Sequence, residues 1–178
     1  MGKRIFLWQA AGFAFVSLAG SLLHFLYDWT GESVLIAPFS GINESTWEHM
    51  KLLYWPFLLF AVIQRRWFRA YPQFWCIQLE SAIAGLLAIP LLFYTCNGIF
   101  GKTPDWVNIT LFYLSTGTAF SLAGWRFRQG AKSCRHPHLA LALLLLLGLL
   151  FGIFTFLPPR IPLFQDPITG GFGKFYDA

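Results

Sequence analysis

Residues 24–51 have the sequence HFLYDWTGESVLIAPFSGINESTWEHMK and join the first two strongly apolar segments of the chain. Four of the eight acidic residues and two of the four histidines lie within this stretch. Ionisable side chains are costly inside a bilayer, so a dense group of them between apolar segments indicates a connection at one membrane surface. We therefore expect a membrane protein with this connection at one end.

The composition also favours lipid over water as the solvent. The 178 residues are 56% hydrophobic and only 12% charged, whereas an ordinary soluble domain carries about 25% charge. The net charge of +5 does not indicate a nucleic-acid partner, because the basic residues fall in short clusters between apolar runs. Three widely spaced cysteines show neither a metal motif nor a disulfide framework.

Five apolar segments are long enough to span a bilayer, which requires about 20 helical residues each. They cover approximately residues 5–27, 47–64, 74–94, 106–125 and 139–157. No internal repeat separates them, so residues 1–178 are expected to form a single membrane-embedded domain. The predicted fold class is all-α, an integral membrane bundle of five transmembrane helices.

The charged residues predict the orientation of this bundle. Nine Lys and Arg residues precede the first span or follow the second and fourth spans, and only Lys51, Lys102, Arg160 and Lys174 belong to the opposite end. Seven acids, Asp177 among them, also belong to that opposite end. An excess of Lys and Arg marks the cytoplasmic side. The amino terminus is therefore predicted to be cytoplasmic and the carboxyl terminus outside, in a multi-pass protein of the plasma (inner) membrane.

Two further segments belong to the outer end. Residues 34–39, VLIAPF, are too apolar for a solvated loop and too short to span. We expect the loop after the first helix to be interfacial or re-entrant. Residues 157–178 are apolar but rich in Pro and Gly, which is typical of a turn-rich segment. This carboxyl-terminal tail is expected to fold over the outer face.

The first span also predicts which residues face the bundle interior. Its small and ionisable residues recur at steps of three and four: Ala10, Ala14, Ser17, Ser21, His24 and Asp28. That spacing places them on one helical face. In the second span, Ser45 and Glu48 match a capping box, which alone is a sufficient reason for an acid at Glu48. Glu44 and His49 flank that box.

Carboxylates mixed with imidazoles are ligands of Zn²⁺, Mn²⁺ and Fe²⁺. The candidate metal ligands are His24, Asp28, Glu48 and His49, although no spacing matches a known zinc signature. The candidate catalytic residues, which would handle protons or substrate charge, are Glu44, Glu48 and Lys51. The candidate substrate contacts at the outer end are Trp29, Trp47 and Asp166.

Three functions are compatible with these residues. The leading hypothesis is a metal-dependent membrane enzyme, hydrolase-like, with a lipidic or membrane-accessible substrate. The alternative is a binding or transport protein that holds a small cationic or aromatic solute in a Trp-rich outer pocket without a metal. The third is a subunit whose small-residue faces recruit partner helices or further copies.

The motifs HFLYDW (24–29), GINESTWEHMKLLYWP (41–56) and IPLFQDPITGGFG (161–173) carry a family resemblance. Together they resemble a family of small bacterial polytopic membrane proteins that is defined only as a domain of unknown function. The resemblance spans most of the chain. It implies a bacterial plasma-membrane location and no particular activity.

Overall fold

The structure is a computed structural model that describes residues 2–101, 103–130 and 134–175. The charged residues Lys102, Lys132 and Asp177 lie outside the described part of the chain. Five α-helices and one short 3₁₀-helix follow one another in order: α1 Gly2–Trp29, α2 Thr46–Arg65, α3 Phe74–Phe100, α4 Asp105–Arg128, α5 Pro137–Phe156 and η1 Pro162–Phe164. No strand occurs among the described residues, so the all-α prediction is confirmed.

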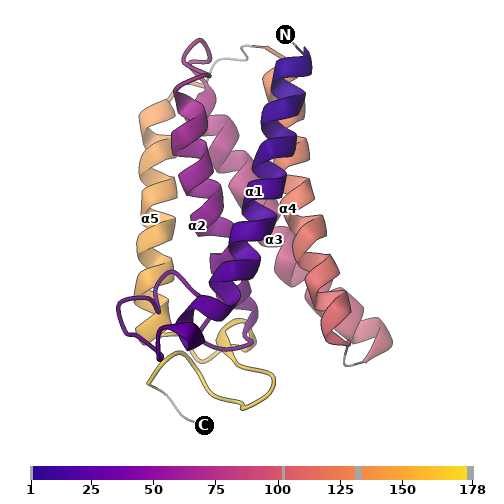
Figure 1. The fold of residues 1–178 in the computed structure, drawn as a ribbon, viewed down its shortest axis with the longest axis vertical. Helices are drawn as coiled ribbons and strands as arrows, with labels where there is room; N and C mark the ends of the chain where they lie inside the picture. The colour runs from indigo at the N-terminus through magenta and orange to yellow at the C-terminus, as the bar shows by residue number, and fades with distance from the viewer. Residues whose placement is uncertain (1, 102, 131–133, 176–178) are drawn as a thin grey trace.

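The helices run roughly side by side and alternate in direction (Figure 1). α2 packs between α1 and α5, α4 packs along α3 and α1, and α3 completes the bundle. Three of the helices, α1, α3 and α5, are long and apolar enough to cross a membrane. α2 is less apolar, but most of its residues are buried by its neighbours. Its polar side chains are therefore screened by protein.

The buried face of α1 differs from the expected one. Ala10, Ala14 and Asp28 are exposed, and the buried stripe instead includes Gly12 and Gly20. A Cβ atom at Gly20 would lie 2.6 Å from the Leu52 carbonyl oxygen of α2. The rotation of α1 is therefore set by the close approach of two backbones at Gly20. It is not set by the row of small residues that includes Ala10 and Ala14.

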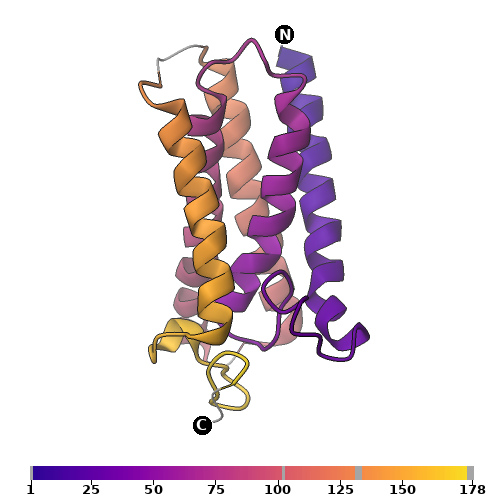
Figure 2. The same cartoon turned by 90° about the vertical axis from the view of Figure 1, so that its left-hand side faces the viewer.

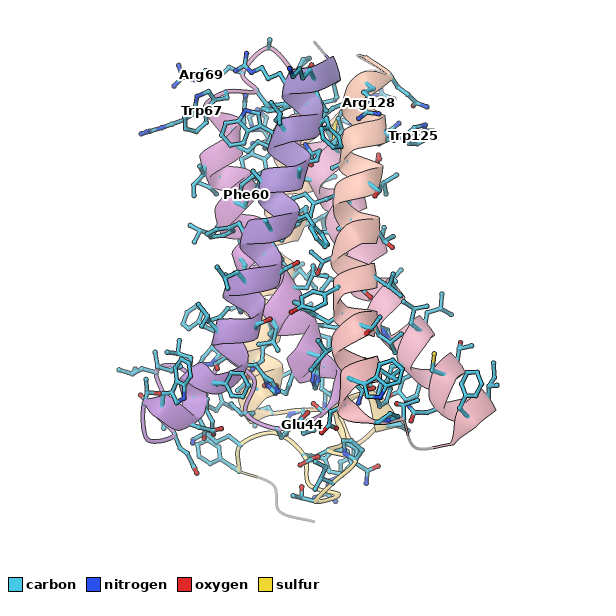
Figure 3. All side chains as sticks on the ribbon, turned by 45° about the vertical axis from the view of Figure 1, so that its right-hand side comes forward. Glu44, Phe60, Trp67, Arg69, Trp125 and Arg128 are labelled. Carbon is cyan, nitrogen blue, oxygen red and sulfur yellow. A yellow bond between two sulfur atoms is a disulfide. The ribbon has the colours of Figure 1, made fainter. Side chains whose placement is uncertain are left out.

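One end of the bundle carries the chain's basic clusters. Figure 3 shows Arg69 and Arg128 at this end and Glu44 at the other. The acid of α3, Glu80, lies toward the basic end and forms an ion pair with Arg126 of α4 at 2.6 Å. The charge asymmetry along the sequence is therefore an asymmetry between the two ends of the bundle.

The structure joins Cys76 at the start of α3 to Cys134 in the α4–α5 connection by a disulfide, with the Cα atoms 6.2 Å apart. The spacing of the cysteines along the sequence did not indicate this pair. The two cysteines are 58 positions apart in the chain, and only the packing of α3 beside the α4–α5 connection brings them together. Cys96 remains a free thiol.

The opposite end is covered by the α1–α2 connection and by the segment after α5 (Figures 1 and 2). The segment after α5 turns back through η1, whose Phe164 ring packs against Trp47 of α2 at 4.6 Å between centroids. Farther along, Lys174 donates hydrogen bonds to the Tyr27 hydroxyl and to the Glu32 carbonyl oxygen. These contacts tie the last described residues to the end of α1.

Candidate functional site

The candidate site lies where the last turns of α1 meet the first turn of α2. The α1–α2 connection reaches it through Ser40, a buried residue whose hydroxyl donates to the Leu23 carbonyl oxygen. The same hydroxyl accepts the Tyr27 amide at 3.1 Å. In a regular helix that amide would bond to the Leu23 carbonyl directly. Ser40 is therefore inserted into the hydrogen-bond ladder of α1 at the turn that carries His24, an insertion that bends helices.

The first turn of α2 is built by its cap. Ser45 accepts the Glu48 amide at 3.4 Å, so the predicted N-cap is present. The Glu48 carboxylate does not return to the Ser45 amide, as a full capping box requires. Asn43 accepts that amide instead, at 3.0 Å. The cap places His49 on the helix and leaves Glu44 just before it, in the connection.

Three side chains converge from these elements: His24 of α1, Glu44 of the connection and His49 of α2. The His24 Nε2 atom lies 3.6 Å from one carboxylate oxygen of Glu44. The His49 Nε2 atom lies 3.5 Å from the other oxygen. A potential ligand atom from each of the three residues lies within 4.8 Å of the other two. Within the described residues this is the group with the composition and spacing of a metal site.

The orientation of the His49 ring is held by the backbone. Its Nδ1 atom lies 3.0 Å from the Ser45 carbonyl oxygen. A carbonyl oxygen only accepts, so Nδ1 carries a proton and donates to it, and in the neutral ring Nε2 then has the lone pair that a metal ion needs. Metal-binding histidines usually donate their second nitrogen to such an acceptor, which sets the tautomer and the ring plane. The Ser45 carbonyl oxygen fixes the tautomer and the ring plane of His49 in this way.

The three residues are partly open to the surroundings. The exposed fractions of the side chains are 34% for His24, 25% for His49 and 42% for Glu44. At this exposure the contacts between them contribute little to the stability of the fold. A small ion can reach them without any rearrangement of the bundle.

Glu48 and Lys51 lie outside the group of His24, Glu44 and His49 and pair with each other. The Lys51 ammonium lies 2.6 Å from the Glu48 carboxylate, and both side chains are buried. Lys51 also donates to the Ala37 carbonyl oxygen at 2.8 Å and to the Thr155 hydroxyl at 2.9 Å. Its three donors are thus all used. Glu48 further accepts the Ile42 amide at 3.0 Å.

This buried ion pair ties three parts of the chain together. It joins α2 to two points of the α1–α2 connection, Ala37 and Ile42, and to Thr155 of α5. The structure does not bring Glu48 into the group formed by His24, Glu44 and His49. Glu48 and Lys51 hold in place the connection that carries Glu44.

The remaining candidate residues are also placed apart from this group. Asp28 and Trp29 are exposed on the last turn of α1. Trp47 is buried among the rings of Phe151, Phe154 and Phe164. The Asp166 carboxylate is occupied by its own turn, where it accepts the Ile168 amide and the Thr169 hydroxyl.

A cavity of about 380 Å³ lies beside the three residues. Glu44 and His49 form part of its wall, and the described residues that line it also come from α3, α4 and the tail. The apolar part of the wall is formed by Ile89, Phe93, Leu111, Phe112, Pro167 and Ile168. The polar part is formed by Glu44, Thr46, His49, Tyr94, Asn97, Thr103, Asp105 and Asn108. Its volume lies within the usual range for small-molecule sites.

The residue patterns in the sequence did not indicate the α3–α4 side of this cavity. There Asn97 accepts the Thr103 amide at 3.0 Å, and the Thr103 hydroxyl donates to Asn108 at 3.0 Å. This network orders the turn between the two helices, next to Asp105. The available signal was the run of polar residues between two apolar segments, the same signal that singled out residues 24–51.

Comparison with known proteins leaves the activity open. No curated protein matches the chain, and no solved structure matches it. One family model does match, over residues 3–174, which include all the residues of the site and confirm the resemblance to an uncharacterised family. The chain belongs to DUF6512, a family of unknown function.

Proposed function

We propose that the protein is a multi-pass membrane protein that binds a divalent transition metal through His24, Glu44 and His49 and uses it to hydrolyse a membrane-accessible substrate. The observation that carries the proposal is the convergence of two imidazoles and one carboxylate from three separate elements. This set includes His24 and His49 from the sequence-based ligand hypothesis and replaces Asp28 and Glu48 with Glu44.

The spacing of the three residues supports a metal. Zinc is bound by histidine and carboxylate ligands at roughly 2.0–2.2 Å, so two ligands of a tetrahedral site lie about 3.4 Å apart. Each histidine lies near that distance from a different oxygen of Glu44, at 3.6 and 3.5 Å, and one ligand atom from each of the three residues lies within 4.8 Å of the other two, so small side-chain movements would close the site around an ion. Two histidines and a glutamate are a known catalytic set for zinc, with a fourth position open. Mn²⁺ and Fe²⁺ accept the same ligand types.

The cavity supports a reaction at this group. An ion bound by these residues supplies Lewis-acid activation of water. Glu44 and His49 belong both to the ligand set and to the cavity wall, so a bound molecule would lie against them. The apolar wall residues fit an acyl or other hydrocarbon group, and Asp105 adds a second carboxylate for a polar end. A lipidic substrate has both parts.

The membrane arrangement is part of the same proposal. α1, α3 and α5 meet the requirements of length and hydropathy, and the alternation of the helices then takes α2 and α4 through the membrane with them. The basic end carrying Arg69 and Arg128 faces the cytoplasm under the positive-inside rule. The site then opens outward, in a bacterial plasma membrane. The exposure of Val34 and Leu35 supports a position of the α1–α2 connection in the lipid interface.

A metal analysis of the purified protein tests the proposal. Wild-type protein in neutral detergent should retain about one equivalent of Zn²⁺ per chain, and His24→Ala, Glu44→Gln and His49→Ala should each lose it. Asp28→Asn is the matched control, since Asp28 is exposed one turn beyond His24. His138→Ala, an exposed histidine at the other end of the bundle, controls for adventitious binding. The proposal fails if all variants bind metal equally or if the wild type binds none.

Hydrolysis needs its own measurement. A fluorogenic long-chain acyl ester in mixed micelles is the probe, assayed with and without added Zn²⁺. We expect turnover by the wild type that is lost in His49→Ala and kept in Asp28→Asn. Metal binding without turnover of this ester would restrict the proposal to a metal-binding protein.

A second function, binding of a cationic solute without a metal, is favoured by one observation. The cavity combines two carboxylates, Glu44 and Asp105, with the aromatic rings of Phe93, Tyr94 and Phe112. Carboxylates and aromatic faces are what organic cations bind. Thermal stabilisation by an alkylammonium ion that is lost in Asp105→Asn, in protein stripped of metal, would support this function.

A further inference from the structure

A second groove lies far from the metal-ligand group, between α1 and α4 at the basic end. It has a volume of about 340 Å³. The residues on which its character depends are Gln9 and Phe13 of α1 and Gly117, Ser121, Trp125 and Arg128 of α4. Figure 3 shows Trp125 and Arg128 on α4 at this end of the bundle. The groove is apolar along its length and positively charged at its mouth.

Gln9 is the unusual residue of this groove. Only 7% of its surface is exposed, and neither its amide nitrogen nor its amide oxygen has a hydrogen-bond partner in the described structure. The side chain packs on Gly124, where a Cβ atom would lie 3.2 Å from the Gln9 Cγ atom. Buried polar groups of folded proteins are nearly always bonded. Both amide atoms are closed off from solvent, and a molecule bound in the groove can supply the missing partner once the Gln9 side chain turns toward it.

The charge at the mouth of the groove is also unmatched. Arg126 is paired with Glu80 of α3, whereas no carboxylate of a described residue lies within ion-pair distance of Arg128. In the sequence pattern, seven of the eight acids belong to the opposite end. The remaining acid, Glu80, is already paired with Arg126. The mouth therefore attracts an anionic group.

The dimensions of the groove match one leaflet. Arg128 and Gly117 are eleven residues apart, which is about 16 Å along a helix, close to half of the roughly 30 Å hydrocarbon thickness of a bilayer. Gln9 lies at the level of Gly124, one turn below Arg128 and therefore about 6 Å deeper. In a phospholipid the ester carbonyl groups lie just below the phosphate, and the acyl chains continue toward the midplane.

We propose that this groove binds one anionic phospholipid. Its phosphate pairs with Arg128, an ester carbonyl accepts from the Gln9 amide, and an acyl chain lies along Gly117 and Ser121. The site rests on the proposed membrane insertion of the bundle but not on the metal or on any activity. Basic pockets between membrane helices are known to hold such head groups.

A second copy of the chain is the less favourable occupant. Two copies in one membrane have the same orientation, so a two-fold interface along α4 would bring Arg128 close to the partner copy at the same depth. Like charges would then face one another. It would also leave the Gln9 amides of both copies to find partners on an apolar face.

Lipid titration of the purified full chain in a neutral maltoside detergent tests the site. Phosphatidylglycerol should raise the midpoint of thermal unfolding at a roughly tenfold lower concentration than phosphatidylcholine, as expected for one hydrogen bond to a charged group. Arg128→Gln should remove this preference and Arg128→Lys should keep most of it. Arg69→Gln is the matched control, an exposed arginine at the same end but away from the groove (Figure 3).

A substitution of Gln9 tests the proposed hydrogen bond to the lipid separately from any change in charge or stability. Wild-type protein should prefer diester phosphatidylglycerol over its diether analogue, which has no carbonyl groups, and Gln9→Leu should bind both equally. Gly117→Leu, whose added Cβ atom would meet only Phe13, at van der Waals distance, should block the acyl path and weaken both lipids.

The proposal is overturned by any of three results. These are equal stabilisation by phosphatidylglycerol and phosphatidylcholine, an Arg69→Gln effect as large as that of Arg128→Gln, or a stable dimer that the lipid does not dissociate and that Gly117→Leu disrupts. Native mass spectrometry should show one retained anionic lipid per chain. If that lipid is retained while the metal analysis fails, only the proposed metal function is lost.

Discussion

The Lys51 ammonium lies 2.6 Å from the Glu48 carboxylate, in the first turns of α2, and neither group reaches solvent. A buried charge whose partner is removed destabilises a protein by about 3–5 kcal/mol, whereas removal of both charges together is often neutral. The net contribution of the pair to the free energy of unfolding is therefore small. Its main effect is to fix the position of the α1–α2 connection.

We expect Lys51→Met to lower the free energy of unfolding by about 3–5 kcal/mol, because Glu48 is left charged and buried. The double variant Glu48→Gln with Lys51→Met should recover most of that loss. Thermal unfolding in detergent, with Asp28→Asn as a surface control, measures both. A double variant no more stable than the single one would contradict this account of the pair.

Ser40 provides a test of how the site is positioned. Removal of its hydroxyl in Ser40→Ala leaves the Leu23 carbonyl and the Tyr27 amide free to bond directly, as in a regular helix. The turn carrying His24 then moves away from Glu44. We expect folding to persist and the affinity for Zn²⁺ to fall by roughly tenfold or more, as for the loss of a supporting contact around a metal.

The measurement is a competition titration against a zinc chelator. Ser33→Ala is the matched control, since Ser33 lies in the same connection and its hydroxyl makes no hydrogen bond among the described residues. Unchanged affinity in Ser40→Ala would show that the inserted hydroxyl does not position His24.

Acid should release the metal. The two imidazoles must be neutral to bind it, so protons compete directly with the ion, and the affinity should rise with pH until both histidines are neutral. Equilibrium dialysis against a fixed concentration of Zn²⁺ at several pH values measures the effect. Binding that does not vary with pH, or that survives His24→Ala, would assign the metal to other residues.

The cysteines test the orientation of the bundle. Cys76 and Cys134 lie at the basic end, which the positive-inside rule places in the cytoplasm. Disulfides are rare in that reducing compartment. We expect both thiols to react with a maleimide reagent in rapidly quenched cells and the disulfide to form only on oxidation of the purified protein.

Cys96 belongs to the other half of α3 and serves as the reference thiol. A Cys76–Cys134 disulfide already complete in growing cells would reverse the proposed orientation. Cys134→Ser should abolish the oxidised form under either orientation, so it identifies the bond without depending on the topology.

Local patterns were sufficient to predict the helices. The five apolar segments became five helices, and Ser45 caps α2 as expected, because hydrophobic content and capping depend on residues close together in the chain. The separation of basic and acidic residues along the sequence likewise became two chemically different ends, since helices of similar length alternate in direction.

The grouping of the site residues depended on more than local pattern. The structure brings His24 and His49 together with Glu44, which the sequence had suggested for catalysis, and leaves Asp28, a suggested metal ligand, outside that group. Which acid reaches the histidines depends on the rotation of α1 and on the path of the connection. No periodicity encodes that path.

The sequence by itself therefore determined a helical, lipid-compatible chain with its basic residues at one end and a concentration of acids and histidines at the other. Only the tertiary structure decided which side chains meet. Gly20 allows α1 to approach α2, and the Lys51–Glu48 pair anchors the connection that delivers Glu44. Contacts between distant parts of the chain depend on such packing, whereas helix formation depends on neighbours a few residues away.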